Sequence, residues 1–138
     1  MTNPLPQGAI IGILGGGQLG RMLSVAASRL GLKTCVFEPS ADCPASHVAN
    51  VHIQASYDDA DALNAFAAAC DVITYEFENI PTSALDILEE LRPIHPNRTA
   101  LATSQDRLVE KAFLQNLGLN TAPFANVETA DDLAQAIE

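Results

Sequence analysis

The sequence predicts an α/β protein with a Rossmann-like parallel sheet and helices on both of its faces. Apolar runs of strand length alternate with segments of helical periodicity through residues 1–97. Of the 138 residues, 48% are hydrophobic, which is enough to build a core. Three consecutive glycines join the first apolar run to the first helical segment, where an α/β protein brings its backbone close to a ligand. We therefore expect residues 1–97 to form one domain.

The first predicted elements surround this glycine turn. An apolar run predicts a strand over residues 9–14, and a helix should follow over residues 18–30 and end at Gly31. Further strands are expected over residues 33–38 and 51–54. The helix is indicated by apolar residues that recur at helical spacing: Leu19, Met22, Leu23, Ala26 and Leu30.

The next elements continue the alternation of strand and helix. Asp58 or Asp59 can cap a second helix, for which the spacing of apolar residues predicts a buried stripe. A fourth strand is expected over residues 71–75, and Pro81 suits the first position of a helix that runs to about residue 91. Ile94 is expected to centre a brief fifth strand. The predicted buried stripe of the second helix consists of Leu63, Phe66, Ala67 and Cys70.

The strand-helix rhythm stops after Pro96. Residues 98–102 predict a short helix, and Ser104 is expected to cap a longer one over residues 105–117. Another helix opens near Thr129 and has no room to finish. We interpret residues 98–138 as a linker and the first helices of a second, truncated domain of a longer protein.

Composition narrows the class of partner. Seventeen acidic residues against seven basic ones give a net charge of −10, and no cluster of Lys or Arg occurs, which argues against nucleic acid. No apolar run approaches the roughly 18 residues of a membrane span, and no signal peptide is present, so we expect no membrane partner and a cytoplasmic protein. The three cysteines, an odd number without paired short spacing, predict free thiols and no metal site.

The glycine turn has several interpretations. Gly15, Gly17 and Gly20 match the spacing of the dinucleotide fingerprint, and Glu38 ends the next apolar run, near the position of a ribose-binding acid. An NAD-binding Rossmann domain of an oxidoreductase is therefore one hypothesis. The N-terminus of the following helix also favours an anion or a polar oxygen, and a turn without any ligand is a third possibility.

Acidic residues follow the fourth predicted strand. Ligands of open α/β sheets bind at the carboxyl ends of the strands, where the loops that carry Gln18, Glu38, Glu76 and Glu78 should converge. In an extended segment Glu76 and Glu78 would share one side and could accept hydrogen bonds from an amine or hydroxyls. The alternative is a solvated strand end. No activated nucleophile with a base stands out, so no catalytic residue is predicted.

Cations gather at only one helix start, in the segment that contains Arg107 and Lys111. At a spacing of four residues these two can share an exposed helix face. Arg107 could instead reach a nucleotide phosphate. The residues alone leave both interpretations open.

Several motifs together resemble one family. The chain is similar, over about residues 9–127, to the N-terminal part of the ATP-dependent carboxyaminoimidazole ribonucleotide synthetases, also described as ATPase subunits of phosphoribosylaminoimidazole carboxylase, in the ATP-grasp superfamily. The resemblance implies a pre-ATP-grasp domain of a purine-biosynthesis ligase. Such a ligase carboxylates the amine of aminoimidazole ribonucleotide with bicarbonate and ATP, through carboxyphosphate, and releases ADP and phosphate. The motifs are Gly-Gly-Gly-Gln-Leu-Gly-Arg-Met at 15–22, Pro44-Ala45, Thr-Tyr-Glu-Phe-Glu-Asn at 74–79, Gln105-Asp106-Arg107, Lys111 and Thr-Ala-Pro-Phe at 121–124.

The resemblance also implies roles for individual residues. Gln18, Leu19 and Glu76 match positions that bind the ribonucleotide, and Arg107 matches an arginine that contacts ATP. Mg²⁺ would accompany ATP, with its ligands outside this chain, and the full-length protein is expected to be a homodimer. Residues 1–138 alone are expected to be inactive. Glu38 stands where aspartate is more usual, and its role, like that of Glu78, stays open. A binding or dimerisation module without chemistry is a further hypothesis.

Overall fold

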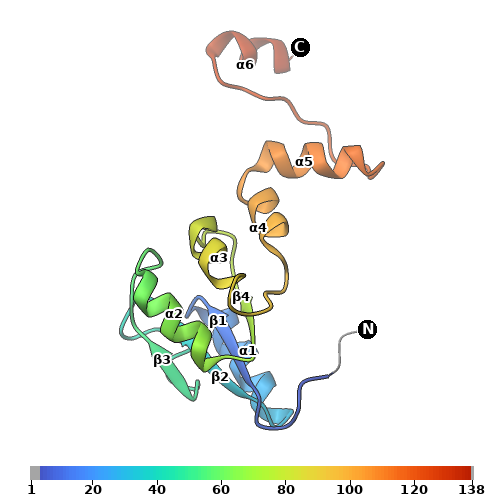
Figure 1. The fold of residues 1–138 in the computed structure, drawn as a ribbon. Coiled ribbons are helices and arrows are strands. Elements are labelled where there is room, and N and C mark those ends of the chain that lie inside the picture. The colour runs from blue at the N-terminus through green and yellow to red at the C-terminus, as the bar shows by residue number, and fades with distance from the viewer. Residues whose placement is uncertain (1–3, 138) are drawn as a thin grey trace. The chain divides into compact units, whose positions relative to one another are not determined.

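In the computed structural model, which describes residues 4–137, four parallel strands form one sheet (Figure 1). They are β1 (Ile10–Leu14), β2 (Lys33–Phe37), β3 (Val51–Ile53) and β4 (Val72–Tyr75). Their order in the sheet is β3-β2-β1-β4. The α/β class and all four of these predicted strands are confirmed, with shifts of about one residue at their ends.

The register of the sheet brings three loops to one edge. Leu14, the last residue of β1, pairs with Phe37 on β2 and with Tyr75 on β4. The glycine turn, Glu38 and Glu76 therefore leave the sheet together at its carboxyl edge. This register creates the site described below.

One face of the sheet is covered by α2 (Ala60–Ala69) and α3 (Thr82–Leu88). Asp59 caps α2 by accepting a hydrogen bond from the N–H of Ala62 at 2.9 Å. The second predicted helix and its buried stripe are confirmed, whereas α3 ends three residues earlier than expected. The main core lies here and includes Phe37, Leu63, Phe66, Leu85, Leu88 and Leu101.

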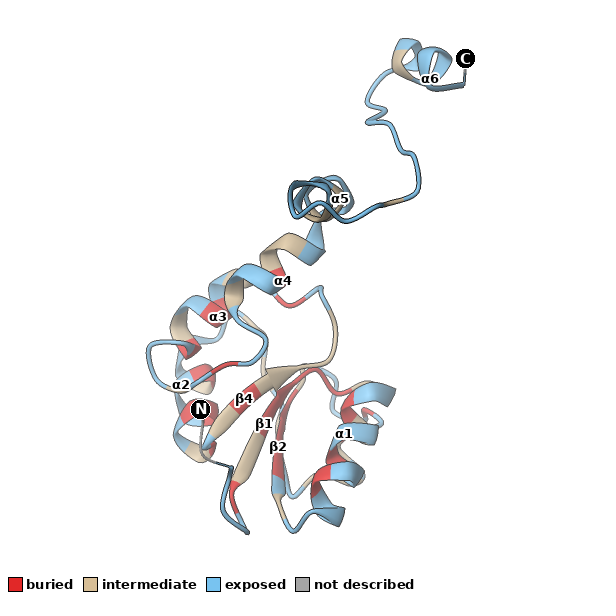
Figure 2. Cartoon of the chain, turned by 90° about the vertical axis from the view of Figure 1, so that its right-hand side faces the viewer, coloured by how far each residue is buried: buried red, intermediate tan, exposed pale blue. Residues whose placement is uncertain are grey.

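The other face carries α1 (Gln18–Arg29), which Figure 2 shows on the opposite side of the sheet from α2 and α3. The helix buries only small residues, Gly20, Ser24 and Ala27. The large side chains that predicted this helix face solvent, with Met22 58% exposed and Leu30 71% exposed. Periodicity therefore predicted the helix correctly but did not indicate which residues it buries.

The chain divides into two compact units, one ending at Ala102 and the other beginning at Thr103. α4 (Arg98–Gln105) spans this boundary, and α5 (Arg107–Asn116) and α6 (Ala130–Ile137) follow. Neither α5 nor α6 contains a buried residue. The assignment of residues 98–138 to a further domain remains a prediction.

Two local predictions near this boundary need correction. Ser104 does not cap α5, because α4 continues through Gln105 and the cap is Asp106, whose carboxylate accepts from the next helix's Leu108 and Val109 amides, each at 2.9 Å. The expected fifth strand is reduced to a single parallel bridge between Ile94 and Ile73. Within residues 4–137, no helix combines the length and apolar character needed to cross a membrane.

Candidate functional site

Glu76 closes the N-terminal end of α1. One carboxylate oxygen accepts the backbone N–H of Gly17 at 2.5 Å, and the other accepts the N–H of Gly20 in a short hydrogen bond. These donors belong to the first turn of the helix, which has no side-chain cap of its own. A negative charge from β4 thus caps α1 and complements the positive end of its dipole.

The glycines of the turn make room for this carboxylate. Gly15 has a φ of +102°, and a Cβ on it would lie 2.5 Å from the Cγ of Glu76. A Cβ on Gly17 would lie 2.7 Å from a carboxylate oxygen of the same residue. On Gly20 it would lie 2.8 Å from the carbonyl oxygen of Gly15. Steric crowding by the protein's own groups is therefore sufficient to explain glycine at these positions.

Glu38 contacts the same turn from β2. Its carboxylate accepts the backbone N–H of Gly16 at 3.0 Å, and a Cβ on Gly16 would lie 2.6 Å from its Cγ. Successive amides of the glycine turn are therefore bound by two different acids, Glu38 and Glu76. Both acids are only partly exposed.

A pocket of about 280 Å³ lies between these groups. The predicted convergence of the loops after β1, β2 and β4 is confirmed, because all three contribute to its lining. The lining includes three carboxylates, those of Glu38, Asp42 and Glu76, and no lysine or arginine of residues 4–137. The lining residues are Gly16, Gly17, Glu38, Ser40, Asp42, Cys43, Pro44, Glu76 and Phe77.

This geometry changes what the turn can bind. The amides of Gly17 and Gly20, which a dinucleotide fingerprint would offer to a pyrophosphate, already donate to Glu76. An acid-lined pocket suits a ligand with N–H or O–H donors better than a phosphate, because like charges repel. The expectation of a free anion site at the start of α1 is therefore not supported by the arrangement of these groups.

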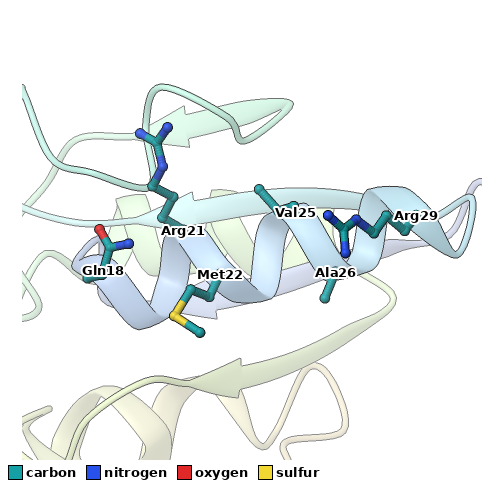
Figure 3. Close-up of a pocket in the computed structure, with 6 residues that line it drawn as sticks. All are labelled: Gln18, Arg21, Met22, Val25, Ala26 and Arg29. Carbon is teal, nitrogen blue, oxygen red and sulfur yellow. The ribbon is translucent and has the colours of Figure 1, made fainter.

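Gln18 and Leu19 lie just beyond this pocket, in the first turn of α1, and both are exposed. Neither belongs to the pocket lining that contains Glu76. Gln18 instead borders a separate hollow of about 310 Å³, whose lining side chains, from Gln18 to Arg29, all belong to α1 (Figure 3). Their assignment as substrate-binding residues stays a prediction.

Glu76 and Glu78, predicted to share one side of an extended segment, do not both line the pocket. The chain bends at Glu76, immediately after Tyr75, and forms a turn at Glu78. Glu76 and Phe77 both line the pocket, which an extended segment would not allow. Glu78 is exposed and is not part of the lining.

Arg107 begins α5, in the unit that starts at Thr103. Its side chain is 78% exposed and pairs with Glu110 at 2.5 Å. Lys111 lies over the ring of Phe124, with its Nζ 4.8 Å from the ring centroid. Arg107 is accessible to a ligand, and its role as an ATP contact stays a prediction.

The cysteines and the other potential metal ligands are the remaining candidates for a site. All three cysteines, Cys35, Cys43 and Cys70, are free, and all three are buried. A hydrogen bond with Cys35, together with burial, raises the pKa of the Cys70 thiol well above its ordinary value, so Cys70 stays protonated at neutral pH. Among residues 4–137, no three His, Cys, Asp or Glu side chains form a group that could hold a metal ion.

A parallel sheet with a glycine turn and two acids at its carboxyl edge defines a Rossmann-like domain. A family model described as the ribonucleotide synthetase preATP-grasp domain matches residues 9–105, and the chain belongs to this family. The Rossmann-like pre-ATP-grasp assignment is thereby confirmed.

Named relatives cover nearly the whole chain. The N5-carboxyaminoimidazole ribonucleotide synthase of Brucella melitensis is 53% identical over 133 residues, which are 96% of this chain and 37% of the relative. The Staphylococcus aureus N5-carboxyaminoimidazole synthetase, solved with ADP, is 47% identical with a TM-score of 0.90, and the match covers 99% of this chain and 36% of that one.

A third relative was solved with two ligands. The Aspergillus clavatus N5-carboxyaminoimidazole synthase, in complex with ADP and 5-aminoimidazole ribonucleotide, is 31% identical with a TM-score of 0.78. The match covers 94% of this chain and 35% of that one. The chain therefore spans little more than a third of the length of these relatives.

Proposed function

We propose that residues 1–138 are the N-terminal part of an ATP-dependent carbon–nitrogen ligase of purine biosynthesis. The ligase joins bicarbonate to the amine of aminoimidazole ribonucleotide, through carboxyphosphate, and gives carboxyaminoimidazole ribonucleotide, ADP and phosphate. The observation that carries the proposal is the match to synthases of this name across 96% and more of the chain. Because those relatives are much longer, the chain alone contributes part of a site and is inactive.

The pocket beside the glycine turn supports a role in holding the ribonucleotide. Its acids are suited to accept hydrogen bonds from an amine or from ribose hydroxyls. Glu76 already accepts two backbone N–H groups, so its carboxylate is oriented and still has acceptor capacity for a ligand. We assign substrate contacts to Glu76 and, in the adjacent turn, to Gln18 and Leu19. The phosphate of the ribonucleotide is then bound by cations outside this chain.

Arg107 is our candidate contact to ATP. An arginine that is 78% exposed can exchange its partner Glu110 for a phosphate at modest cost, since exposed ion pairs contribute little to stability. Bound Mg²⁺ would offset the negative charge of the ATP phosphates. The side chains of residues 4–137 do not form a cluster suited to this ion, so we assign none of them to it. We further propose a cytoplasmic homodimer for the full-length protein.

The test uses the full-length protein and measures release of phosphate. We expect release that requires both aminoimidazole ribonucleotide and bicarbonate, and none from residues 1–138 alone. Glu76→Gln should raise the KM for the ribonucleotide about tenfold or more, because a hydrogen bond to a charged group is lost. Phosphate release that ignores the ribonucleotide would overturn the proposal, and unchanged kinetics in Glu76→Gln would overturn the role of that residue.

The alternative, an NAD-binding domain of an oxidoreductase, is not favoured. Glu76 occupies the amides on which the pyrophosphate would lie. Thermal unfolding of the protein with and without NAD separates the two hypotheses, because a ligand that binds the native state raises the unfolding temperature. We expect no shift with NAD.

A further inference from the structure

Glu38 lies just after β2, and it accepts hydrogen bonds from two other segments and from its own loop. One carboxylate oxygen accepts the N–H of Gly16 at 3.0 Å and the hydroxyl of Tyr57 at 3.3 Å. The other accepts the N–H of Ser40 at 3.1 Å. A carboxylate offers about four lone-pair sites, so groups of the protein occupy most of its capacity.

Gly16 connects this network to Glu76. Its N–H donates to Glu38, while the N–H of the next residue, Gly17, donates to Glu76 at 2.5 Å. The carbonyl oxygen of Gly16 accepts the N–H of Ala45 at 2.9 Å. Two neighbouring amides bound by two different acids fix the orientation of the peptide between them. A movement of Glu38 would therefore change the turn that orients Glu76.

Tyr57 supports Glu38 from the segment that leads into α2. Its ring packs on Phe37, with ring centroids 5.6 Å apart, so the position of its hydroxyl is well defined. Burial, and next the negative charge of Glu38, raise the pKa of the Tyr57 hydroxyl above its ordinary value. The hydroxyl therefore keeps its proton at neutral pH and remains a donor to Glu38.

We propose that Glu38 is a positioning residue for the ribonucleotide site: it fixes the Gly16 amide and, through the glycine turn, the carboxylate of Glu76. This inference rests on the proposed function, since the ribonucleotide is the ligand whose affinity Glu38 sets. It differs from the role of the acid in a dinucleotide site, which touches the ribose itself.

Four variants of the full-length protein test this role by kinetics. Glu38→Gln keeps the size of the side chain but turns one acceptor into a donor that faces other donors. It should raise the KM for the ribonucleotide about tenfold and leave the KM for ATP and kcat within about twofold. Glu38→Asp keeps the charge, so its KM for the ribonucleotide should be closer to that of the wild-type protein. Tyr57→Phe removes one donor of three and should have a smaller effect.

The fourth variant, Glu90→Gln, makes the same change of charge at an exposed position outside the pocket lining and should leave all three parameters unchanged. An unaltered KM for the ribonucleotide in Glu38→Gln would overturn the positioning role. So would an equal rise in the KM for ATP, because the effect would then not belong to this site.

A second readout does not depend on activity. Amide hydrogen exchange over residues 15–20, measured without ligands, should be faster in Glu38→Gln than in the unchanged protein, and unchanged in Glu90→Gln. Tyr57→Phe should show a smaller increase, and because it lacks only a hydroxyl, it serves as the variant most certain to fold. Exchange rates that are unaltered in both Glu38→Gln and Tyr57→Phe would overturn the inference. A protein without ribonucleotide-dependent turnover would instead overturn the proposed function, while exchange still decides whether Glu38 holds the turn.

Discussion

The two faces of the sheet differ in the balance of forces that holds their helices. On the face under α2 and α3, large side chains such as Phe66 and Leu85 are fully buried. On the face under α1, the helix buries only Gly20, Ser24 and Ala27. What holds α1 there includes polar contacts at its first turn, where Glu76 binds two amides. Large apolar side chains from both layers thus account for one face, whereas the other combines a smaller buried cluster, Ile13, Val36 and Ala45, with a charged cap on α1.

The largest expected effect tests the apolar face. Phe66→Ala removes a fully buried ring that packs edge-on against Phe37, with ring centroids 5.4 Å apart. We expect it to lower the free energy of unfolding by about 3–5 kcal/mol, because a cavity replaces the ring. Urea unfolding followed by circular dichroism measures this loss. A loss under about 1 kcal/mol would mean that this face is not the main source of stability.

The second effect tests the charged cap of α1. Glu76→Ala leaves the partly buried amides of Gly17 and Gly20 without their acceptor and should lower the free energy of unfolding by about 2 kcal/mol. Glu90→Ala, at an exposed position, is the matched control for loss of a carboxylate. The same urea titration applies to both. Equal losses in the two variants would contradict a special role for Glu76 in holding α1.

A third effect tests how closely the start of α1 approaches the sheet. Gly20→Ala places a methyl group 2.8 Å from the carbonyl oxygen of Gly15, a backbone atom with little freedom to move. We expect the free energy of unfolding to fall by about 1–3 kcal/mol, although alanine is ordinarily favoured over glycine within a helix. A gain in stability, read from the midpoint of thermal unfolding, would show that the turn can open at low cost.

The smallest effect completes the comparison. Met22→Ala truncates a side chain on α1 that is 58% exposed. We therefore expect the free energy of unfolding to change by no more than about 0.5 kcal/mol. Measured beside Phe66→Ala under the same conditions, it gives the contrast between the two faces directly. If Met22→Ala lowered the free energy of unfolding as much as Phe66→Ala does, the distinction between the two faces would not hold.

The sequence was informative where a large apolar residue recurs at a regular spacing. β1, β2, β4 and α2 follow such patterns, and the buried stripe of α2 through Phe66 was predicted correctly. The buried side of α1 was not predicted, because glycine, serine and alanine carry almost no hydrophobic signal. The cap of α5 was assigned to Ser104 rather than Asp106, because the end of the preceding helix has no glycine or proline to mark it.

The candidate site was predictable as a location but not as a set of contacts. The convergence of three loops follows from parallel strand order, which alternating patterns indicate. The bonds from Gly16 to Glu38 and from Gly17 to Glu76 join residues 22 and 59 positions apart, and no local pattern encodes them. The involvement of Tyr57 had no signal in the sequence, since a tyrosine near a helix start is compatible with many roles.

The carboxylate of Glu76 competes with any external anion for the backbone amides of the glycine turn. Because it is tethered to β4, it faces the amides of Gly17 and Gly20 at an effective concentration of the order of millimolar or more. A free phosphate or nucleotide must displace it to reach those amides, whereas a neutral or cationic donor group can bind to it. The geometry of the turn therefore disfavours free anions and leaves acceptor capacity on Glu76 for N–H or O–H donors.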